Sequence, residues 1–153
     1  MKTTIKIRRF KGCDARSVSR IIRRCLREVN AESQPARIID GLCKEFSRGK
    51  IKKRIRQFDV FVALDCKRIL GTASLHLDQI MSVFVSPSLH GQGVGSRLMA
   101  HVEGIAKKRG VNKTFLSASP NAAGFYKSHG YRKIRDFYNE FGGYMTRMSK
   151  VLR

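Results

Sequence analysis

The stretch Ser82 to Ala100, which reads SVFVSPSLHGQGVGSRLMA, decides the fold of this chain. A short apolar run is followed by Pro87, by three glycines at positions 91, 93 and 95, and then by the start of a helical pattern. A strand that enters a helix through such a turn presents backbone N–H groups and a helix N-terminus, an arrangement that binds phosphate. Glycine turns also occur simply to let a strand meet a helix, so the spacing by itself leaves both interpretations open.

Two common phosphate-binding loops do not match this stretch. A Walker loop is excluded because no Gly-Lys-Ser/Thr sequence is present to supply the lysine and the magnesium ligand. The dinucleotide pattern has its third glycine three residues after the second and an acidic residue further on. Here the glycines alternate evenly, and the following apolar segment, TFLSA, offers no acid.

The patterns along the rest of the chain predict a single α/β domain over residues 1–153. Ile5 and Ile7 alternate with basic residues, as in a half-buried strand, and an amphipathic helix follows a cap at Asp14 or Ser17. A second helix follows Pro35, a third lies between the glycine turn and Gly110, and a fourth covers about 121–128. Further strands are expected at 59–65, 69–77, 79–85, 114–118, 131–138 and 144–152.

The composition restricts the partners and the compartment. Lys and Arg number 32 against 11 Asp and Glu, and the net charge of +21 attracts polyanions and repels polycations. No apolar run approaches the roughly 20 residues that span a bilayer, and the N-terminus lacks the apolar core of a signal peptide. We therefore expect a soluble, cytoplasmic protein without a membrane contact. The four cysteines form no CxxC pair and have no histidine at ligand spacing, so we expect reduced core thiols and no metal site.

Two segments match one family pattern in the correct order. Val85-Ser86-Pro87 leads to His90-Gly91-Gln92-Gly93-Val94-Gly95, and the segment from Asn121 to Tyr131 reads NAAGFYKSHGY. The first resembles the Arg/Gln-x-x-Gly-x-Gly/Ala acetyl-CoA loop of the GNAT superfamily of N-acetyltransferases. The second is similar to the N-x-x-A-x-x-F-Y-x-x-x-G-F/Y segment of the same superfamily, with Gly124 where alanine is common. The resemblance covers nearly the whole chain.

This resemblance implies a fold and a cofactor. The fold is a central mixed, mostly antiparallel sheet of six to seven strands, flanked by about four helices, with a splayed strand pair that holds acetyl-CoA as co-substrate. His90 stands where the family usually has Arg or Gln, and its shorter side chain cannot reproduce an arginine fork. We expect weakened rather than abolished binding, because the family holds the pyrophosphate mainly through backbone N–H groups. The implied cofactor contacts are Val83, Phe84, Val85, His90, Gly91, Gln92, Gly93, Val94, Gly95, Ser96, Asn121 and Tyr126.

The resemblance also implies direct attack of a primary amine on the thioester, with no acyl-enzyme and no cysteine nucleophile. Tyr126 matches the family's general acid, and with a reference pKa near 10 a tyrosine is protonated at pH 7. Asp78 and His76 are candidate bases near the junction of two strands, and an ordered water is the alternative. Which face of the strand looks into the cleft is left open. Asn121 is expected to contact the pantetheine amides, to cap a helix, or to do both.

The charge predicts a small-molecule or protein amine acceptor that is not polycationic. The resemblance places the acceptor between the first two helices and the last hairpin. Arg23, Arg27, Lys50 and Arg54 lie near it if their helices face that way, and otherwise form a solvated face. Two other functions stay open: a basic RNA- or ribosome-associated protein, which either acetylates an RNA-borne amine or only binds through its N-terminal helices, and a catalytically silent acetyl-CoA sensor. The sequence leaves open whether the chain forms a homodimer.

Overall fold

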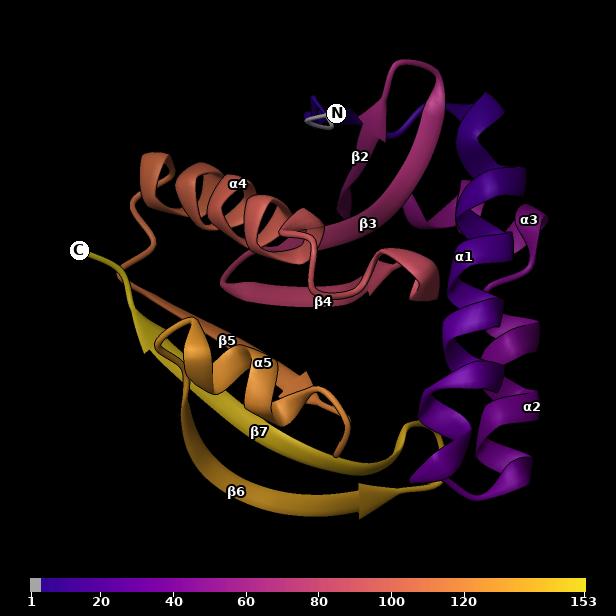
Figure 1. Ribbon diagram of the computed structural model, residues 1–153. Coiled ribbons are helices and arrows are strands. Elements are labelled where there is room, and N and C mark those ends of the chain that lie inside the picture. Colours follow the sequence, from indigo (N-terminus) through magenta and orange to yellow (C-terminus); the bar gives the residue numbers. More distant parts are fainter. Residues whose placement is uncertain (1–3) are drawn as a thin grey trace.

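The computed structural model describes residues 4–153, which form one mixed sheet with helices on both faces (Figure 1). The sheet has seven strands in the order β1-β2-β3-β4-β5-β7-β6, and only the β4–β5 pair is parallel. The strands are β1 (Lys6–Arg9), β2 (Asp59–Asp65), β3 (Arg68–His76), β4 (Gln79–Val85), β5 (Lys113–Ala118), β6 (Arg132–Asn139) and β7 (Gly143–Val151). The helices are α1 (Ala15–Glu28), α2 (Ala36–Glu45), α3 (Arg48–Arg54), α4 (Val94–Lys108) and α5 (Ala123–Ser128). The mixed, mostly antiparallel architecture expected from the sequence is confirmed.

The described residues contain one α-helix more than the four expected. The additional helix, α3, lies in the basic run that follows α2, where Ile51 is buried at 3% exposure. Its seven residues include only this one buried apolar side chain, which is too few to produce a helical period in the sequence.

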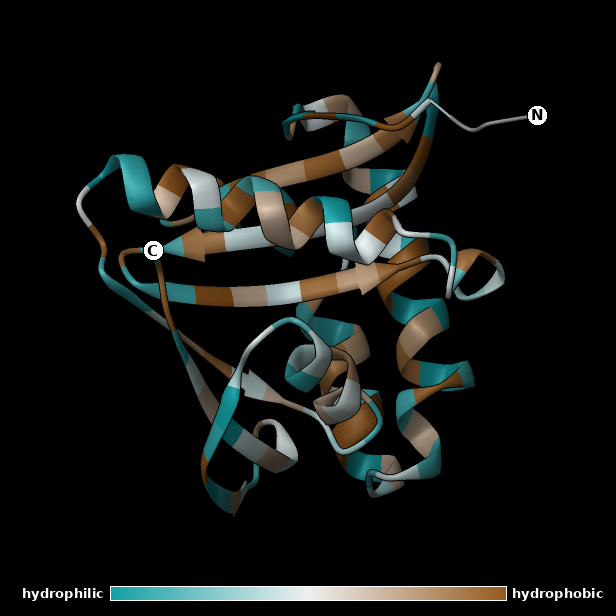
Figure 2. Cartoon of the chain, turned by 60° about the vertical axis from the view of Figure 1, so that its left-hand side comes forward, coloured by the Kyte–Doolittle hydropathy of each residue, from teal (hydrophilic) through white to brown (hydrophobic). Residues whose placement is uncertain are grey.

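Helices α1, α2 and α3 cover one face of the sheet. The apolar stripe of α1, which includes Val18, Ile22 and Leu26, packs into a cluster with residues of α2, α3 and β2. Along α1 the hydrophobic residues recur with helical spacing between hydrophilic ones, as in an amphipathic helix (Figure 2).

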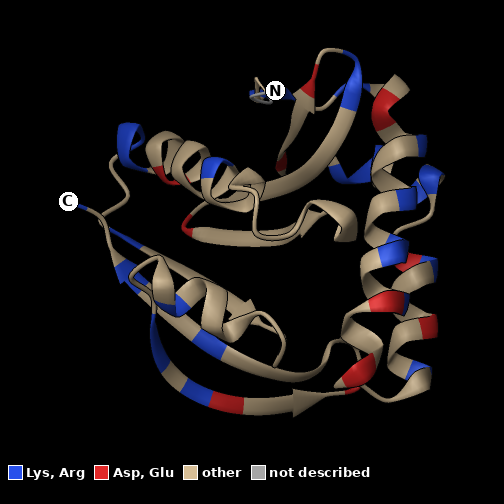
Figure 3. Ribbon diagram, in the orientation of Figure 1, with Lys and Arg blue, Asp and Glu red and all other residues tan. Residues whose placement is uncertain are grey.

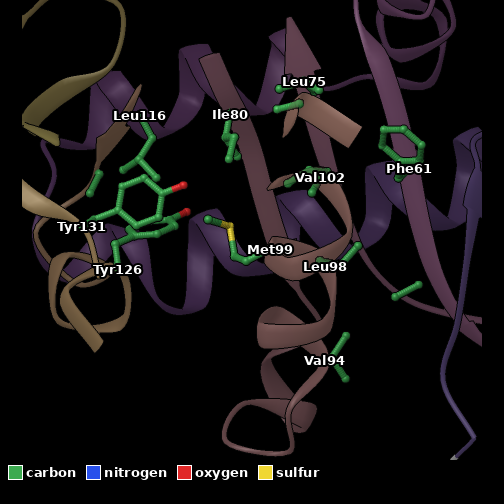
Figure 4. Packing of buried hydrophobic residues seen from close by; sticks show 14 of the residues in the cluster. Phe61, Leu75, Ile80, Val94, Leu98, Met99, Val102, Leu116, Tyr126 and Tyr131 are labelled. Carbon is green, nitrogen blue, oxygen red and sulfur yellow. The ribbon is translucent and has the colours of Figure 1, made fainter. Parts of the chain in front are cut away.

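Helices α4 and α5 cover the opposite face. Successive side chains of a strand point to opposite faces, so Phe61 of β2 joins the cluster around α4 while Val62 joins the cluster around α1. Figure 4 shows Leu98, Met99 and Val102 of α4 within this second cluster. The sheet is therefore buried between two helical layers.

Strands β4 and β5 separate soon after they meet. Their register contains the single pair Gln79 and Phe115, and beyond it the two strands diverge (Figure 1). On the other side of β4, the register with β3 shifts between Thr72 and Ser74, and Ser82 has a left-handed φ of 52°. A bulge of this kind bends a strand and increases its twist. The expected splayed strand pair is confirmed.

The α1–α2 connection is tied to the turn between β6 and β7 by Gln34. Its side-chain Oε1 accepts a hydrogen bond from the Tyr144 N–H at 2.8 Å, and its Nε2 donates to the Tyr144 carbonyl at 2.7 Å. Gly143 has a φ of 77°, and a Cβ there would lie 2.1 Å from Gln34 Oε1. The absence of a side chain at this position therefore permits the contact between the helical layer and the hairpin.

The cysteines are only partly as expected. All four thiols are free, and Cys25 and Cys43 are buried on the helices, but Cys13 and Cys66 are exposed. Cys13 lies in the short 3-10 helix Gly12–Asp14 and Cys66 in the turn between β2 and β3, so the expectation of core thiols is wrong for these two. None of the helices in residues 4–153 has the length and hydrophobicity to cross a bilayer.

Candidate functional site

A cavity of about 920 Å³ occupies the opening between β4 and β5 and reaches both faces of the sheet. Residues of α1, α2 and α3 line it from one side, and the turn before α4, the first residues of α4 and α5 line it from the other. The structure thus brings together eleven of the residues predicted to contact the cofactor: Val83, Phe84, Val85, His90, Gly91, Gly93, Val94, Gly95, Ser96, Asn121 and Tyr126. The lining does not include Gln92, whose Nε2 donates to the Ser88 carbonyl at 3.5 Å.

The glycine turn delivers the N-terminus of α4 to this cavity. Gly91 and Gly93 have φ values of 80° and 88°, a backbone region that other residues adopt at a cost. Gly95 is needed for a different reason, because a Cβ there would lie 3.0 Å from Cζ of Phe125 on α5. The first N–H groups of a helix have no partner within it and carry the positive end of the helix dipole. The turn therefore offers unpaired donors to an anion in the cavity.

His90 attaches this turn to the end of β4. Its Nε2 lies 2.8 Å from the Val85 carbonyl oxygen, so this nitrogen carries the proton if the bond forms. The Cys25 thiol of α1 donates to the same oxygen at 3.0 Å, and burial raises the pKa of this thiol to about 12. The imidazole thus turns back toward the strand and helps to position the loop.

Tyr126 of α5 lines the cavity. Its side chain is buried, and its hydroxyl makes no hydrogen bond with any residue between 4 and 153. Burial raises the pKa of Tyr126, so the hydroxyl stays protonated at neutral pH. Tyr131 lies beside it (Figure 4), but its hydroxyl is bonded to Thr114 and Glu103, both at 2.9 Å. Of these two neighbouring tyrosines, only Tyr126 has a free donor.

Asn121 precedes α5 on the cavity wall but does not cap it. The N-cap position is occupied by Ala122, and the Asn121 side chain forms no hydrogen bond with the described part of the chain. The expectation of a cap is wrong, and the amide is free to contact a ligand.

Comparison with known proteins assigns these features to a family. Residues 30–152 match the family model described as an acetyltransferase (GNAT) domain. The chain belongs to the GNAT acetyltransferase family. Enzymes of this family use acetyl-CoA as co-substrate, and this chain is an acetyl-CoA-dependent N-acetyltransferase.

Several solved structures share the GNAT fold. A GCN5-related N-acetyltransferase from Rhodopseudomonas palustris superposes with a TM-score of 0.90 at 24% identity, covering 99% of this chain and 98% of the other. The PaiA N-acetyltransferase from Thermoplasma acidophilum, solved in complex with coenzyme A, has a TM-score of 0.84 at 18% identity, covering 97% and 99%. A ribosomal-protein-alanine N-acetyltransferase from Brucella melitensis has a TM-score of 0.70 at 21% identity, covering 96% and 99%. A search of curated protein sequences returned no match.

The part of the GNAT cavity on the α1–α3 face carries two arginines. The Arg54 guanidinium donates to Ser82 Oγ at 3.1 Å, and that of Arg147 donates to Gln79 Oε1 at 2.6 Å and to Ser117 Oγ at 3.4 Å. Among the described residues, no Asp or Glu lines the cavity. Arg147 lies on β7, and the pattern of polar and apolar residues in this strand gave no indication of a functional role. Arg147 was therefore not predicted from the sequence as a site residue.

The other basic residues considered for the acceptor site lie elsewhere. Arg23 and Arg27 line a separate groove along α1, together with further arginines and Glu28, and Figure 3 shows basic and acidic residues along this helix. Lys50 pairs with Glu45 at 2.9 Å. Of the four candidates, only Arg54 reaches the cavity.

The two candidate bases lie outside the cavity lining of residues 4–153. Asp78 is in the turn between β3 and β4, where its Oδ1 accepts a hydrogen bond from Gln79 Nε2 at 2.7 Å. The Nδ1 atom of His76 lies 3.1 Å from the Gln57 carbonyl oxygen, and the ring packs against Phe58. Both residues lie next to the start of β4, where this strand pairs with β3 and β5. They are away from the other end of β4, which separates from β5.

Proposed function

We propose that this acetyltransferase, acting as one domain over residues 1–153, transfers an acetyl group from acetyl-CoA to a primary amine by direct attack in a ternary complex. The observation that carries the proposal is the hydroxyl of the buried Tyr126 side chain, which has no hydrogen-bond partner among residues 4–153 and belongs to a residue that lines the opening between β4 and β5. A protonated donor at that place can stabilise the sulfur that leaves the thioester.

The cofactor is proposed to bind along the edge that the splay exposes on β4. The pyrophosphate would accept hydrogen bonds from the N-terminus of α4. Past Gln79, β4 has no ladder partner on β5, so its backbone can pair with the pantetheine amides, and Asn121 can do the same. A backbone N–H near Val85 would polarise the thioester carbonyl, a contact worth roughly 3 kcal/mol in other enzymes.

The chemistry then needs one bond to form and one to break. The amine nitrogen attacks the carbonyl carbon, the carbon–sulfur bond breaks, and the thiolate receives a hydrogen bond and then a proton from Tyr126. A thiol has a pKa of about 8.5, and the raised pKa of Tyr126 keeps its proton in place until negative charge develops on sulfur. Since no carboxylate among residues 4–153 lines the cavity, we assign the proton of the amine to water rather than to Asp78.

Calorimetric titration with acetyl-CoA, followed by thiol-release assays on a panel of amines, tests the proposal. Tyr126→Phe should lower kcat by about 100-fold or more, since general acids contribute at least that much, and should leave the Kd for acetyl-CoA nearly unchanged. Tyr131→Phe is the matched control, because it removes a hydroxyl from the same cluster that is already bonded within the protein. Equal kcat values for Tyr126→Phe and the wild type would contradict the assigned role, and normal wild-type turnover would exclude a silent sensor.

Contact with nucleic acid through α1 stays a separate prediction. Arg16, Arg20, Arg24 and Arg48 line the same groove as Arg23 and Arg27. Binding of RNA there should weaken steeply as the salt concentration rises, because it would depend on release of counterions from phosphates. Binding that is absent, or that does not change with salt, would dismiss this function.

A further inference from the structure

We propose that the acceptor amine carries an oxyanion, either a carboxylate or a phosphate, and that Arg54 binds this group. The inference rests on the proposed function, since it names the class of acceptor for the same site. It starts from a half-buried cation that forms no ion pair with any carboxylate of residues 4–153.

Arg54 lies at the end of α3 with its guanidinium between two aromatic rings. Its Cζ is 4.9 Å from the centre of the Phe46 ring and 5.0 Å from that of Phe58. A guanidinium has five N–H donors, and the one hydrogen bond of this group to another described residue goes to Ser82 Oγ. Burial lowers the pKa of Arg54, and the Glu45 carboxylate opposes this shift with a smaller effect. Removing a cation from water without a paired anion is unfavourable, so an anion that enters the cavity gains affinity at this point.

Two other partly buried cations have a carboxylate partner, whereas Arg147 in the same cavity has only Gln79 and Ser117 as partners. Arg8 pairs with Asp14 at 2.7 Å, and Lys150 pairs with Glu103 at 2.8 Å. Glu45 on the preceding helix bonds to Lys50 rather than to Arg54. Arg54 and Arg147 are therefore two cations of the cavity wall that form no ion pair with a described carboxylate.

The position of Arg54 suits a compact acceptor. Ser82, its partner, is the bulged residue of β4, the strand along which we place the thioester. Ser82 is three residues from Val85 on this strand, so an oxyanion held there and an amine at the thioester can belong to one compact molecule, such as an amino acid or an amino-phosphate. Arg147 adds a second positive charge to the same cavity, and the described lining has no carboxylate to hold a second ammonium group. The same charges disfavour diamines and polyamines.

Matched pairs of amines test this inference by thiol release. Amino acids are compared with their carboxamides, and O-phosphoethanolamine with ethanolamine, so that each pair differs in the anionic group. The wild type should show a kcat/KM roughly 10- to 100-fold higher for the anionic member, as expected for a charged hydrogen bond. The pair with the larger ratio identifies the oxyanion as carboxylate or phosphate.

Variants assign the preference to the residue. Arg54→Gln should reduce the ratio within each pair to about one without changing the Kd for acetyl-CoA, and Arg54→Lys should retain part of it. Arg56→Gln is the control, because Arg56 is exposed, lies two residues further along, and is not part of the described cavity lining. Calorimetry with acetyl-CoA also shows whether each variant is folded.

The outcomes separate this inference from the proposed function. Carboxamides that react as well as amino acids, together with ethanolamine that reacts as well as its phosphate, would overturn the role of Arg54 and leave acetyl transfer intact. An equal loss for both members of a pair in Arg54→Gln would reduce the residue to a structural role and would also overturn it. Absence of turnover for every pair in a protein that binds acetyl-CoA would count against the oxyanion, whereas absence of acetyl-CoA binding would contradict the proposed function itself.

Discussion

Replacing Gly143 by alanine should destabilise the protein through a clash with one particular side chain. The new Cβ would lie 2.1 Å from Oε1 and 2.9 Å from Cδ of Gln34, and 3.1 Å from Cγ2 of Ile38. All three contacts are shorter than ordinary van der Waals distance, and the first two are so short that Gln34 must move. If it moves, both of its hydrogen bonds to the Tyr144 backbone are lost.

The cost has two parts of known size. A residue with a Cβ in the left-handed region costs about 1 kcal/mol relative to glycine. Two neutral hydrogen bonds contribute about 1 kcal/mol each. Gly143→Ala should therefore lower the free energy of unfolding by about 3 kcal/mol, which in a domain of this size lowers Tm by about 6 to 12 °C.

A double-mutant cycle with Gln34→Ala identifies the source of the loss. In the Gln34→Ala background that side chain and its two hydrogen bonds are already gone, so Gly143→Ala should cost about 2 kcal/mol less than in the wild type, leaving the backbone contribution and the contact with Ile38. Urea denaturation of the four proteins gives the required free energies. If Gly143→Ala costs the same in both backgrounds, Gln34 is not the obstacle and the reasoning fails.

Three further perturbations probe other parts of the structure. Gly95→Ala should displace Phe125 and raise the Kd for acetyl-CoA in calorimetry, since overpacking of this kind costs about 1 to 3 kcal/mol. Although burial opposes the shift, hydrogen bonds from Arg8 and a backbone N–H hold the pKa of Asp14 below its ordinary value. A lowered carboxyl pKa contributes stability above pH of about 4 that is lost as the pH falls through the folded-state pKa, so Asp14→Asn should be more destabilising in urea at pH 7 than at pH 3. Because burial raises the pKa of Cys25 to about 12, a thiolate-specific reagent at pH 8 should modify this thiol only after unfolding.

The sequence was most informative where local backbone chemistry determines structure. The glycine turn predicted a strand that passes into a helix at an anion site, and the structure places Gly93 in a left-handed conformation directly before α4. The hydrophobic periods of the long elements were equally informative, because a 14-residue helix such as α1 must repeat its apolar face several times.

What could not be predicted depends on contacts between distant segments. The bulge at Ser82 leaves no mark on the composition of its strand, yet it sets the direction in which β4 departs from β5. Arg54 and Asp78 were both candidates by position along the chain, and only the packing of α3 and the turn before β4 decides that the first faces the cavity and the second does not. Residue spacing within one element does not contain that information.

The single pair between β4 and β5 has a consequence for the stability of the apoprotein. Strands β1–β4 form one half of the sheet and strands β5–β7 form the other. The β4–β5 ladder joins the two halves through the pair Gln79 and Phe115. A pantetheine arm bound between the halves would act as a missing strand, and its hydrogen bonds would hold the sheet together as well as position the thioester. Ligand at 100 times its Kd stabilises a folded protein by about 2.7 kcal/mol, so the lifetime of this enzyme would rise and fall with the supply of its own cofactor.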